Sequence, residues 1–457
     1  MRKIFSLGLL CVSALTLGAC GGRLGAPSGT GAPLTPFGNR LIAGTTNLPT
    51  HVVVIVQENR TVDNLFQQLP GADTQSYGLN SLGQQVPLTQ TGLGVSWDPS
   101  HAHSAFVTEF DGGKLDGFDK EKCGTGCPAD AAYTYVDPAD VKQYYEMAEQ
   151  YAFAEHNLQP NEGPSWPGHM YLVAAQSGEP GSNWYVSENP NNKKGTPTNC
   201  LAASATRVVR INMKTNFPGT EGSRIFPCLN GTPTIIDEIA SAGLTWRYYT
   251  PNEGDLWTAP CDIQGYDCPN NPNVVTPQTQ ILTDIANGAL PSVSWVIPGS
   301  KETDHPGSTK NTGGPAWVST VVDAIGESQY WSNTAIFVVW DDWGGFYDHY
   351  LNGNNHPAAK PNDPYEYGLR VPLIAIGPYV RPAYISSTPR DSTSIVHFIE
   401  DNFGLPSLNE LEAQTDDLSE LFNFSQNPNQ FTPFDTGAKT LQEWRMQKPD
   451  PNPVDSE

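Results

Sequence analysis

Positive charge is scarce in this sequence. The 457 residues include 25 Lys and Arg against 48 Asp and Glu, a formal net charge of −23. This balance argues against a nucleic-acid partner and against adhesion to anionic lipid through a basic patch. It does not exclude a phosphate-bearing substrate, because a bound metal ion reverses the local field.

Long apolar runs, internal repeats and heptads are missing beyond residue 20. A membrane-spanning helix needs about 20 apolar residues, so these later segments predict none. Abundant instead are 43 Gly and 40 Pro, together with 11 Trp, 18 Tyr and 17 Phe. The Gly and Pro predict many loops, and the aromatic residues predict a folded core rather than disorder.

Residues 1–19 predict an export signal. Arg2 and Lys3 precede the apolar residues 4–17, and the Leu-Gly-Ala-Cys sequence that ends at Cys20 is similar to a bacterial lipobox. We therefore expect an exported lipoprotein, anchored to a membrane through Cys20, in the periplasm or at the cell surface. The alternative is an ordinary signal peptide cut at a nearby small residue, which also predicts export.

Composition divides the rest of the chain into three parts. Residues 20–48 are rich in Gly, Pro, Ser and Thr and predict a flexible tether. Residues 49–425 predict one globular domain. Residues 426–457 are rich in Pro, Asn and Asp and predict a C-terminal tail, in which residues 440–447 form a short helix.

Cysteine is infrequent, with 8 in the chain. Beyond Cys20 six remain, an even set that predicts three disulfides in an exported protein. We expect local pairs, although six cysteines allow fifteen connectivities and zinc coordination is the alternative. The expected pairs are Cys123–Cys127, Cys200–Cys228 and Cys261–Cys268.

Short β-branched runs bounded by turn residues predict strands, and helical patterns fall between them. The strands are expected at 51–56, 293–297, 335–340 and 371–376. The helices are expected at 138–150, 168–176, 233–242, 316–325 and 392–402. Thr232 is the expected N-cap of the third helix, with Pro233 as its first residue. This alternation predicts an α/β fold with a mostly parallel sheet covered on both faces and loop-rich insertions.

Carboxylates and an amide follow two of the expected strands. Glu58 and Asn59 come after the first, and Asp341 and Asp342 follow residues 335–340. Open α/β sheets bind ligands at the carboxyl ends of their strands, and hard oxygen ligands suit Mg²⁺, Ca²⁺ or Mn²⁺ and also serve Zn²⁺. A shared metal site is therefore predicted, the alternative being solvated acidic loops.

Ser165 lies in a Gly-Pro-Ser-Trp-Pro-Gly segment just before a helical run. A hydroxyl at a helix entrance sits where backbone N–H groups attract negative charge, which suits a nucleophile or a phosphate. The alternative is a plain N-cap serine. We also expect Arg60 and Asp63 to form a local ion pair that fixes the loop after residue 59.

Histidines supply the acid–base candidates. His101 and His103 lie in a loop bounded by proline, His305 follows the strand at 293–297, and His349 follows the acidic loop. A histidine beside a phosphate can stabilise its charge or protonate a leaving oxygen. The alternative for each is a solvated side chain.

The ordered set of these segments resembles the bacterial phosphoesterase family that holds phospholipases C and an acid phosphatase. The Glu-Asn-Arg-Thr-Val-Asp segment from Glu58 is similar to the E-N-R-[S/T]-F-D opening of the family. The segments at 101–103, 163–167, 303–306 and 341–349 match further family motifs in the expected order. Val62 replaces the usual Phe, and Trp343-Gly344 stand where many phospholipases C show Asn-Asp.

The resemblance implies an alkaline-phosphatase-like α/β/α sandwich and one divalent metal ion. The implied ligands of that ion (Ca²⁺, Mg²⁺, Mn²⁺ or Zn²⁺) are Glu58, Asn59, Ser165, Asp341 and Asp342. The implied catalytic residues are Ser165, His103, His305 and His349. Ser165 would attack phosphorus and form a phosphoserine, while the histidines neutralise phosphoryl oxygens or protonate the leaving group.

The sequence leaves the substrate open between monoesters and diesters, with phospholipid as one option. A closed pocket would favour small monoesters and an apolar rim would favour lipids. An alternative from another class is a lipid-anchored binding protein with a degenerate site. That alternative predicts gaps in the metal set, and the sequence shows none.

Overall fold

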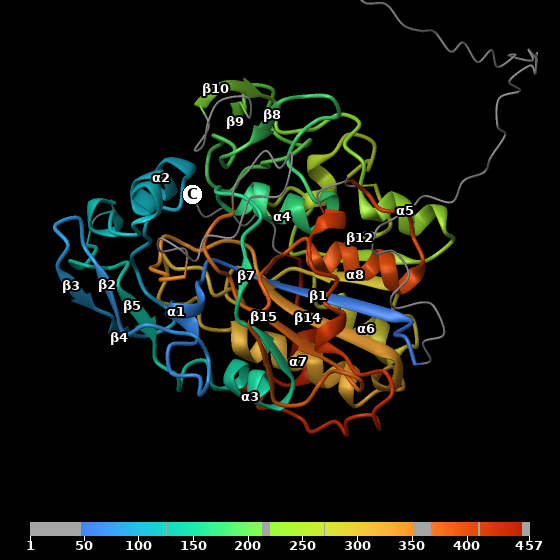
Figure 1. Cartoon of the computed structure of the whole chain (residues 1–457). Helices are drawn as coiled ribbons and strands as arrows, with labels where there is room; N and C mark the ends of the chain where they lie inside the picture. The colour runs from blue at the N-terminus through green and yellow to red at the C-terminus, as the bar shows by residue number, and fades with distance from the viewer. Residues whose placement is uncertain are drawn as a thin grey trace, which may run out of the picture. The chain divides into compact units, whose positions relative to one another are not determined.

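An eight-stranded sheet forms the centre of the fold (Figure 1). The computed structural model describes residues 47–121, 123–124, 126–212, 220–268, 270–350, 367–409 and 412–449, so the predicted export signal and Cys20 lie outside the described residues. In spatial order the strands are β12 (Val274–Val275), β11 (Trp246–Tyr249), β13 (Val293–Val296), β1 (His51–Gln57), β14 (Thr334–Trp340), β15 (Leu373–Ile376), β6 (Ala152–Ala154) and β16 (Tyr384–Ser386).

The sheet is parallel except at one strand. β15 pairs antiparallel with β14 and with β6, and the other pairings are parallel. All of β14 and nearly all of β1 are buried, as expected for strands covered on both faces. Their register places Gln57 beside Trp340, so both strands end at the same level. The predicted α/β fold with a mostly parallel sheet is confirmed.

Helices cover both faces of the sheet. On β14 the Trp340 ring contacts Tyr144 with centroids 5.0 Å apart, and the Phe337 ring contacts Phe398 at the same separation. Residues three apart on a strand point to opposite faces, so the helices of Tyr144 and Phe398 lie on opposite sides. One layer holds α3 (Lys142–Gln150), α6 (Gln280–Ala286) and α7 (Gly314–Gly326). The other holds α4 (Ser165–Ala174), α5 (Ile235–Ser241) and α8 (Ser394–Phe403).

The predicted start of α5 is wrong by two residues. Thr234, not Thr232, is the N-cap, because its side chain accepts from the Asp237 N–H while the Asp237 carboxylate accepts from the Thr234 N–H. This reciprocal capping box satisfies two backbone donors. Thr232 instead donates its hydroxyl to the Gly178 carbonyl, 2.9 Å away.

Smaller elements surround the sheet. The helices are α1 (Val62–Leu65), α2 (His103–Phe110) and α9 (Leu441–Arg445). The strands form one small sheet, β10-β9-β8 (Thr220–Ile225, Val208–Asn212, Trp184–Val186), and three pairs, β2 with β3 (Tyr77–Leu79, Gln85–Pro87), β4 with β5 (Thr89–Thr91, Thr134–Val136) and β7 with β17 (Asn157–Leu158, Arg390–Asp391). Within the described ranges, none of the helices is both long enough and apolar enough to cross a lipid bilayer.

The three predicted disulfides are confirmed, each closing a local loop. The predicted short helix in the C-terminal part is also present as α9, which begins after the N-cap Thr440. The α9 residue Trp444 is 3% exposed and its ring lies against Trp317 of α7, with centroids 5.1 Å apart. Helix α9 therefore packs against α7, in one of the two helix layers.

Candidate active site

The polar ends of β1 and β14 meet in a buried cluster. The Asn59 N–H donates to Asp341 Oδ1 and the Asn59 side-chain amide to Asp342 Oδ1, both at 3.0 Å. Glu58, Asn59, Asp341 and Asp342 are each at most 3% exposed. Asn59 adopts a left-handed backbone (φ 62°), a conformation that asparagine tolerates better than most residues. The structure thus brings together the four metal-binding residues predicted from the two strand ends.

Gly344 closes the acidic loop tightly over Asn59. It has φ 62°, and a Cβ built on it would lie 2.4 Å from the Asn59 carbonyl oxygen. Its N–H donates to Asp342 Oδ1 at 2.7 Å. Only glycine combines this backbone conformation with such a close approach.

Ser165 reaches this cluster from the N-terminus of α4. Its hydroxyl donates to Asp342 Oδ2 at 3.0 Å, and the residue is fully buried. Three residues on, Gly168 lets the helix approach β14, since a Cβ there would lie 2.9 Å from the Asp341 carbonyl oxygen. The predicted nucleophile and the predicted ligands therefore lie in contact, at a helix end that favours negative charge.

His169 belongs to the same cluster and was missed by sequence reasoning. Its Nε2 lies 3.0 Å from Glu58 Oε1 and 3.7 Å from Asp341 Oδ2. Ligand atoms of these three residues lie within 4.8 Å of one another. Burial lowers the pKa of His169 to about 4, so the ring is neutral near pH 7. Its position one turn after Ser165 is the signal that would have placed both side chains on one helix face.

The cluster is electrostatically incomplete without a cation. Burial raises the pKa of Glu58 well above its ordinary value, and the nearby charges of Asp341, Asp342 and Asp255 raise it further. Among the described residues, Glu58 Oε2, Asn59 Oδ1 and Asp341 Oδ2 have no hydrogen-bond partner. Buried unpartnered oxygens are costly, and three of them on residues of this cluster fit a hard or borderline divalent cation.

Two histidines line the cluster on the side of Asn59. His101 Nε2 lies 3.0 Å from the Asn59 side-chain nitrogen, and its Nδ1 lies 2.9 Å from the Pro99 carbonyl oxygen. The His305 ring lies edge-on to His101, with centroids 5.6 Å apart, and its Nδ1 contacts the Pro306 carbonyl at 2.7 Å. The structure therefore places His101 beside Asn59, one of the predicted metal ligands, and His305 beside His101.

His103 lies at the loop that leads into Ser165. It is the first residue of α2, and its Nδ1 lies 3.3 Å from the Glu162 carbonyl oxygen and 3.7 Å from Glu162 Oε2. Its backbone N–H donates to Glu188 at 3.0 Å. The structure thus places His103 next to the residue three positions before the nucleophile.

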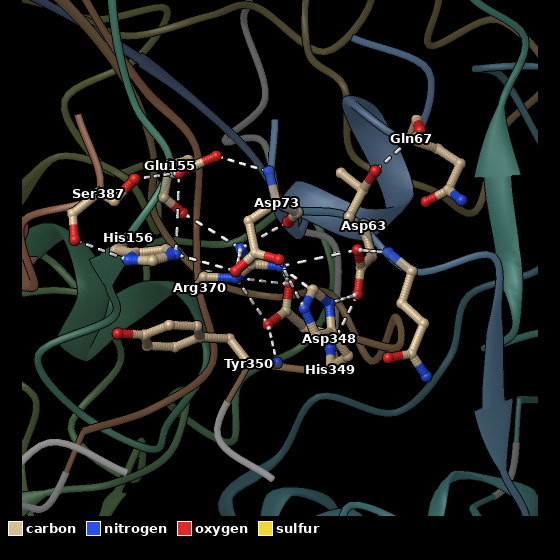
Figure 2. A network of polar contacts seen from close by, with 12 residues as sticks. Asp63, Gln67, Asp73, Glu155, His156, Asp348, His349, Tyr350, Arg370 and Ser387 are labelled. Atoms are coloured by element: carbon tan, nitrogen blue, oxygen red, sulfur yellow. Dashed lines mark hydrogen bonds and ion pairs between the residues drawn. The ribbon is translucent and has the colours of Figure 1, made fainter. Parts of the chain in front are cut away.

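His349 lies in a different network (Figure 2). Its Nδ1 contacts Asp63 Oδ2 at 2.7 Å and its Nε2 contacts Asp73 Oδ1 at 3.2 Å. Arg370 is fully buried in the same network and donates to both oxygens of Asp348. Both ring nitrogens of His349 therefore face carboxylates. Its catalytic role stays a prediction.

The predicted ion pair between Arg60 and Asp63 is wrong. The Arg60 guanidinium donates twice to the Asp304 carbonyl oxygen, at 2.7 and 2.9 Å, and once to Asn64 Oδ1. Asp63 turns to His349 instead. Arg60 therefore joins the loop that carries His305 to its own segment after β1.

Comparison with known proteins identifies the family of this chain. The family model described as Phosphoesterase family matches residues 50–406. The chain belongs to the Phosphoesterase family. The resemblance deduced from the ordered motifs is thereby confirmed, and the family match covers the residues that form the buried cluster.

Similar relatives carry phospholipase names. The chain is 24% identical to the non-hemolytic phospholipase C of Pseudomonas aeruginosa, covering 83% of this chain and 58% of that protein. It is 31% identical to phospholipase C B of Mycobacterium tuberculosis over 33% of each chain. It is 28% identical to the non-specific phospholipase C6 of Arabidopsis thaliana, covering 82% and 68%. The chain spans less than two thirds of the length of both bacterial relatives.

Solved structures show weaker similarity. A protein in the alkaline phosphatase superfamily from Vibrio parahaemolyticus matches with 12% identity and a TM-score of 0.36, covering 81% of this chain and 70% of that one.

Proposed function

We propose that this protein is an exported, metal-dependent phosphoesterase that forms a phosphoserine at Ser165. The observation that carries the proposal is the hydrogen bond from the Ser165 hydroxyl to Asp342, within a buried cluster whose free oxygens fit a cation. Membership of the Phosphoesterase family supports a phosphate ester as the substrate. The expected ligands are Glu58, Asn59, Ser165, Asp341 and Asp342.

One divalent ion (Ca²⁺, Mg²⁺, Mn²⁺ or Zn²⁺) would neutralise phosphoryl oxygens and favour the ionised form of the serine hydroxyl. Ser165 Oγ then attacks phosphorus in line, and its proton passes to Asp342, which already accepts its hydrogen bond. The bond from phosphorus to the leaving oxygen breaks as the bond to Oγ forms. His305 or His103 protonates the leaving oxygen.

Water completes the cycle. It attacks phosphorus on the side opposite Oγ, the bond between phosphorus and Oγ breaks, and Ser165 recovers its proton from Asp342. One histidine takes the proton that the water loses, which restores the starting state. The hydrogen bond from Ser165 to Asp342 supports a covalent route, since it holds the nucleophile in place before the substrate binds.

The names of the relatives favour a phospholipase C-like diesterase, and acid phosphatase activity on monoesters is the alternative substrate class. Phospholipid is the substrate option that agrees with an anchor at Cys20, because a lipid-anchored enzyme works at a membrane surface. We propose export with anchoring in the periplasm or at the cell surface on the basis of residues 1–20.

The test is hydrolysis of p-nitrophenyl phosphate and p-nitrophenylphosphorylcholine by the mature protein, with and without chelator. We expect turnover that chelator abolishes and metal restores. Ser165→Ala should lower kcat by about 10³-fold or more while the protein keeps its metal. Acid quenching followed by mass spectrometry should find phosphate on Ser165 of the wild type.

Ser319→Ala is the matched control, since Ser319 is equally buried but lies on α7. Full activity in Ser165→Ala would exclude the covalent mechanism. A folded wild-type protein that hydrolyses neither substrate would instead favour the anchored binding protein with an inactive site.

A further inference from the structure

His169 occupies an unusual position between two acids. The ring is fully buried on α4, with Nε2 at 3.0 Å from Glu58 Oε1 and 3.7 Å from Asp341 Oδ2. These separations are close to those between neighbouring ligand atoms around one small dication, about 3.3 Å for bonds of 2.0–2.1 Å in a tetrahedron. The ring nitrogen therefore lies where a ligand atom would lie.

The second ring nitrogen determines which tautomer fits. The Tyr248 hydroxyl donates to the Trp257 carbonyl at 2.7 Å, so its oxygen remains as an acceptor. His169 Nδ1 lies 3.5 Å from that oxygen, and this contact is satisfied when Nδ1 carries the proton. Nε2 then presents a lone pair toward two carboxylates. A lone pair facing ionised carboxylates is repulsive unless a cation lies between them.

The opposite tautomer of His169 leaves more polar atoms without a suitable partner. With the proton on Nε2, His169 would donate to Glu58, and the lone pair of Nδ1 would face the Tyr248 oxygen, whose proton points to Trp257. That tautomer also leaves Glu58 Oε2 and Asp341 Oδ2 without partners among the described residues. A cation bound by Nε2, by the Glu58 carboxylate and by Asp341 Oδ2 would give these groups a shared partner.

We propose that His169 coordinates the metal ion through Nε2, which makes the site a mixed nitrogen–oxygen centre. An imidazole ligand favours Zn²⁺ and other transition-metal dications, whereas an all-oxygen site suits Mg²⁺ and Ca²⁺. The contact of Nδ1 with Tyr248 is the kind of outer hydrogen bond that orients a metal-binding histidine. The proposal rests on the proposed metal-dependent function and narrows the identity of its ion.

Pulsed electron paramagnetic resonance of the protein loaded with Mn²⁺ tests the coordination directly. We expect modulation from a directly bound ¹⁴N nucleus in the wild type, and its loss in His169→Gln. His51→Gln is the matched control, since His51 lies at the start of β1 with its Nδ1 on the Pro291 carbonyl. His169→Asn serves as a second variant if glutamine prevents folding.

Competition between metals tests the selectivity. We expect His169→Gln to weaken Zn²⁺ binding at least about 10-fold, as measured by calorimetry. Mg²⁺ binding should change by less than about 3-fold, because Mg²⁺ gains little from an imidazole. Equal losses for both ions would show that His169 orients Glu58 instead of selecting the metal.

The outcomes separate this proposal from the proposed function. A wild type that hydrolyses phosphate esters but shows no ¹⁴N coupling overturns the role of His169 alone. Coupling that depends on His169 without hydrolysis supports the ligand and overturns the enzymatic function. A wild type that binds no divalent ion overturns both.

Discussion

At the scale of single residues, the site depends on a few close approaches. Asn59 holds both aspartates through its backbone and side chain, and Gly344 packs against it with no room for a Cβ. The sequence indicated the acids because they directly follow apolar runs. It did not indicate His169, because one histidine in an otherwise apolar helix is as typical of a core residue as of a ligand.

Gly344→Ala should lower both stability and activity. A left-handed alanine costs about 1–2 kcal/mol and the clash with the Asn59 carbonyl about 1–3 kcal/mol more. Displacement of Asn59 should reduce kcat about 100-fold. Gly243→Ala is the matched control, since Gly243 has φ 75° but open space around it. Urea unfolding and kcat measure the difference, and equal behaviour of the two variants would contradict the close-approach argument.

At the scale of elements, a buried ion network ties three segments together. Asp63 follows β1, Asp348 follows β14, and Arg370 precedes β15. The Arg370 guanidinium joins the two aspartates and also reaches Asp73 (Figure 2). We infer that the network holds the acidic loop in the conformation that brings Asp341 and Asp342 to Glu58.

His349 should make stability depend on pH. Burial by itself lowers the pKa of His349, but the hydrogen bond and charge of Asp63 outweigh it and raise the pKa. The folded state therefore binds the proton more tightly than the unfolded state. The stabilisation of the folded state by protonated His349 is fully present below the ordinary histidine pKa, about 6.5. It is lost as the pH rises through the raised pKa of His349 in the folded state.

We expect His349→Gln to be less stable than the wild type by about 1–3 kcal/mol at pH 5, with a smaller difference at pH 9. Urea unfolding across this range measures it. His51→Gln is the control, because burial lowers the pKa of His51 and its contribution should change with pH in the opposite direction. A large loss of kcat in His349→Gln with the metal still bound would support the catalytic role that the sequence predicted.

At the scale of the whole molecule, residues distant in sequence complete the fold. Predicted as a tail, residues 426–449 place Phe434 and Trp444 in the core, 8% and 3% exposed. Lys439 lies over the Trp444 ring, 3.4 Å from its centroid. Amphipathic patterning over so few residues could predict the short helix but not the surface on which it packs.

Trp444→Ala should destabilise the protein by about 3–5 kcal/mol, because it removes a large buried ring that contacts Trp317. The kcat of the folded fraction should not change, since α9 contributes no side chain to the candidate active site. Leu441→Ala on the same helix is the control, as Leu441 is 40% exposed and should cost less than about 1 kcal/mol. Thermal unfolding of both variants provides the measurement, and equal melting temperatures would show that this segment adds no stability.

The sequence by itself determined the central strands, the acids at their ends, the local disulfides and the family. Each of these follows from short-range patterns, because β-branched runs, turn residues and ordered motifs are legible within a few residues. Only the tertiary structure decided that His169 faces Glu58 and that His349 pairs with Asp63. It also decided that Arg60 donates to the carbonyl of Asp304, in the loop that carries His305. Those partners depend on how α4 is rotated and packed against the sheet and on the conformation of long loops. Both are determined by contacts between residues that lie hundreds of positions apart in the sequence.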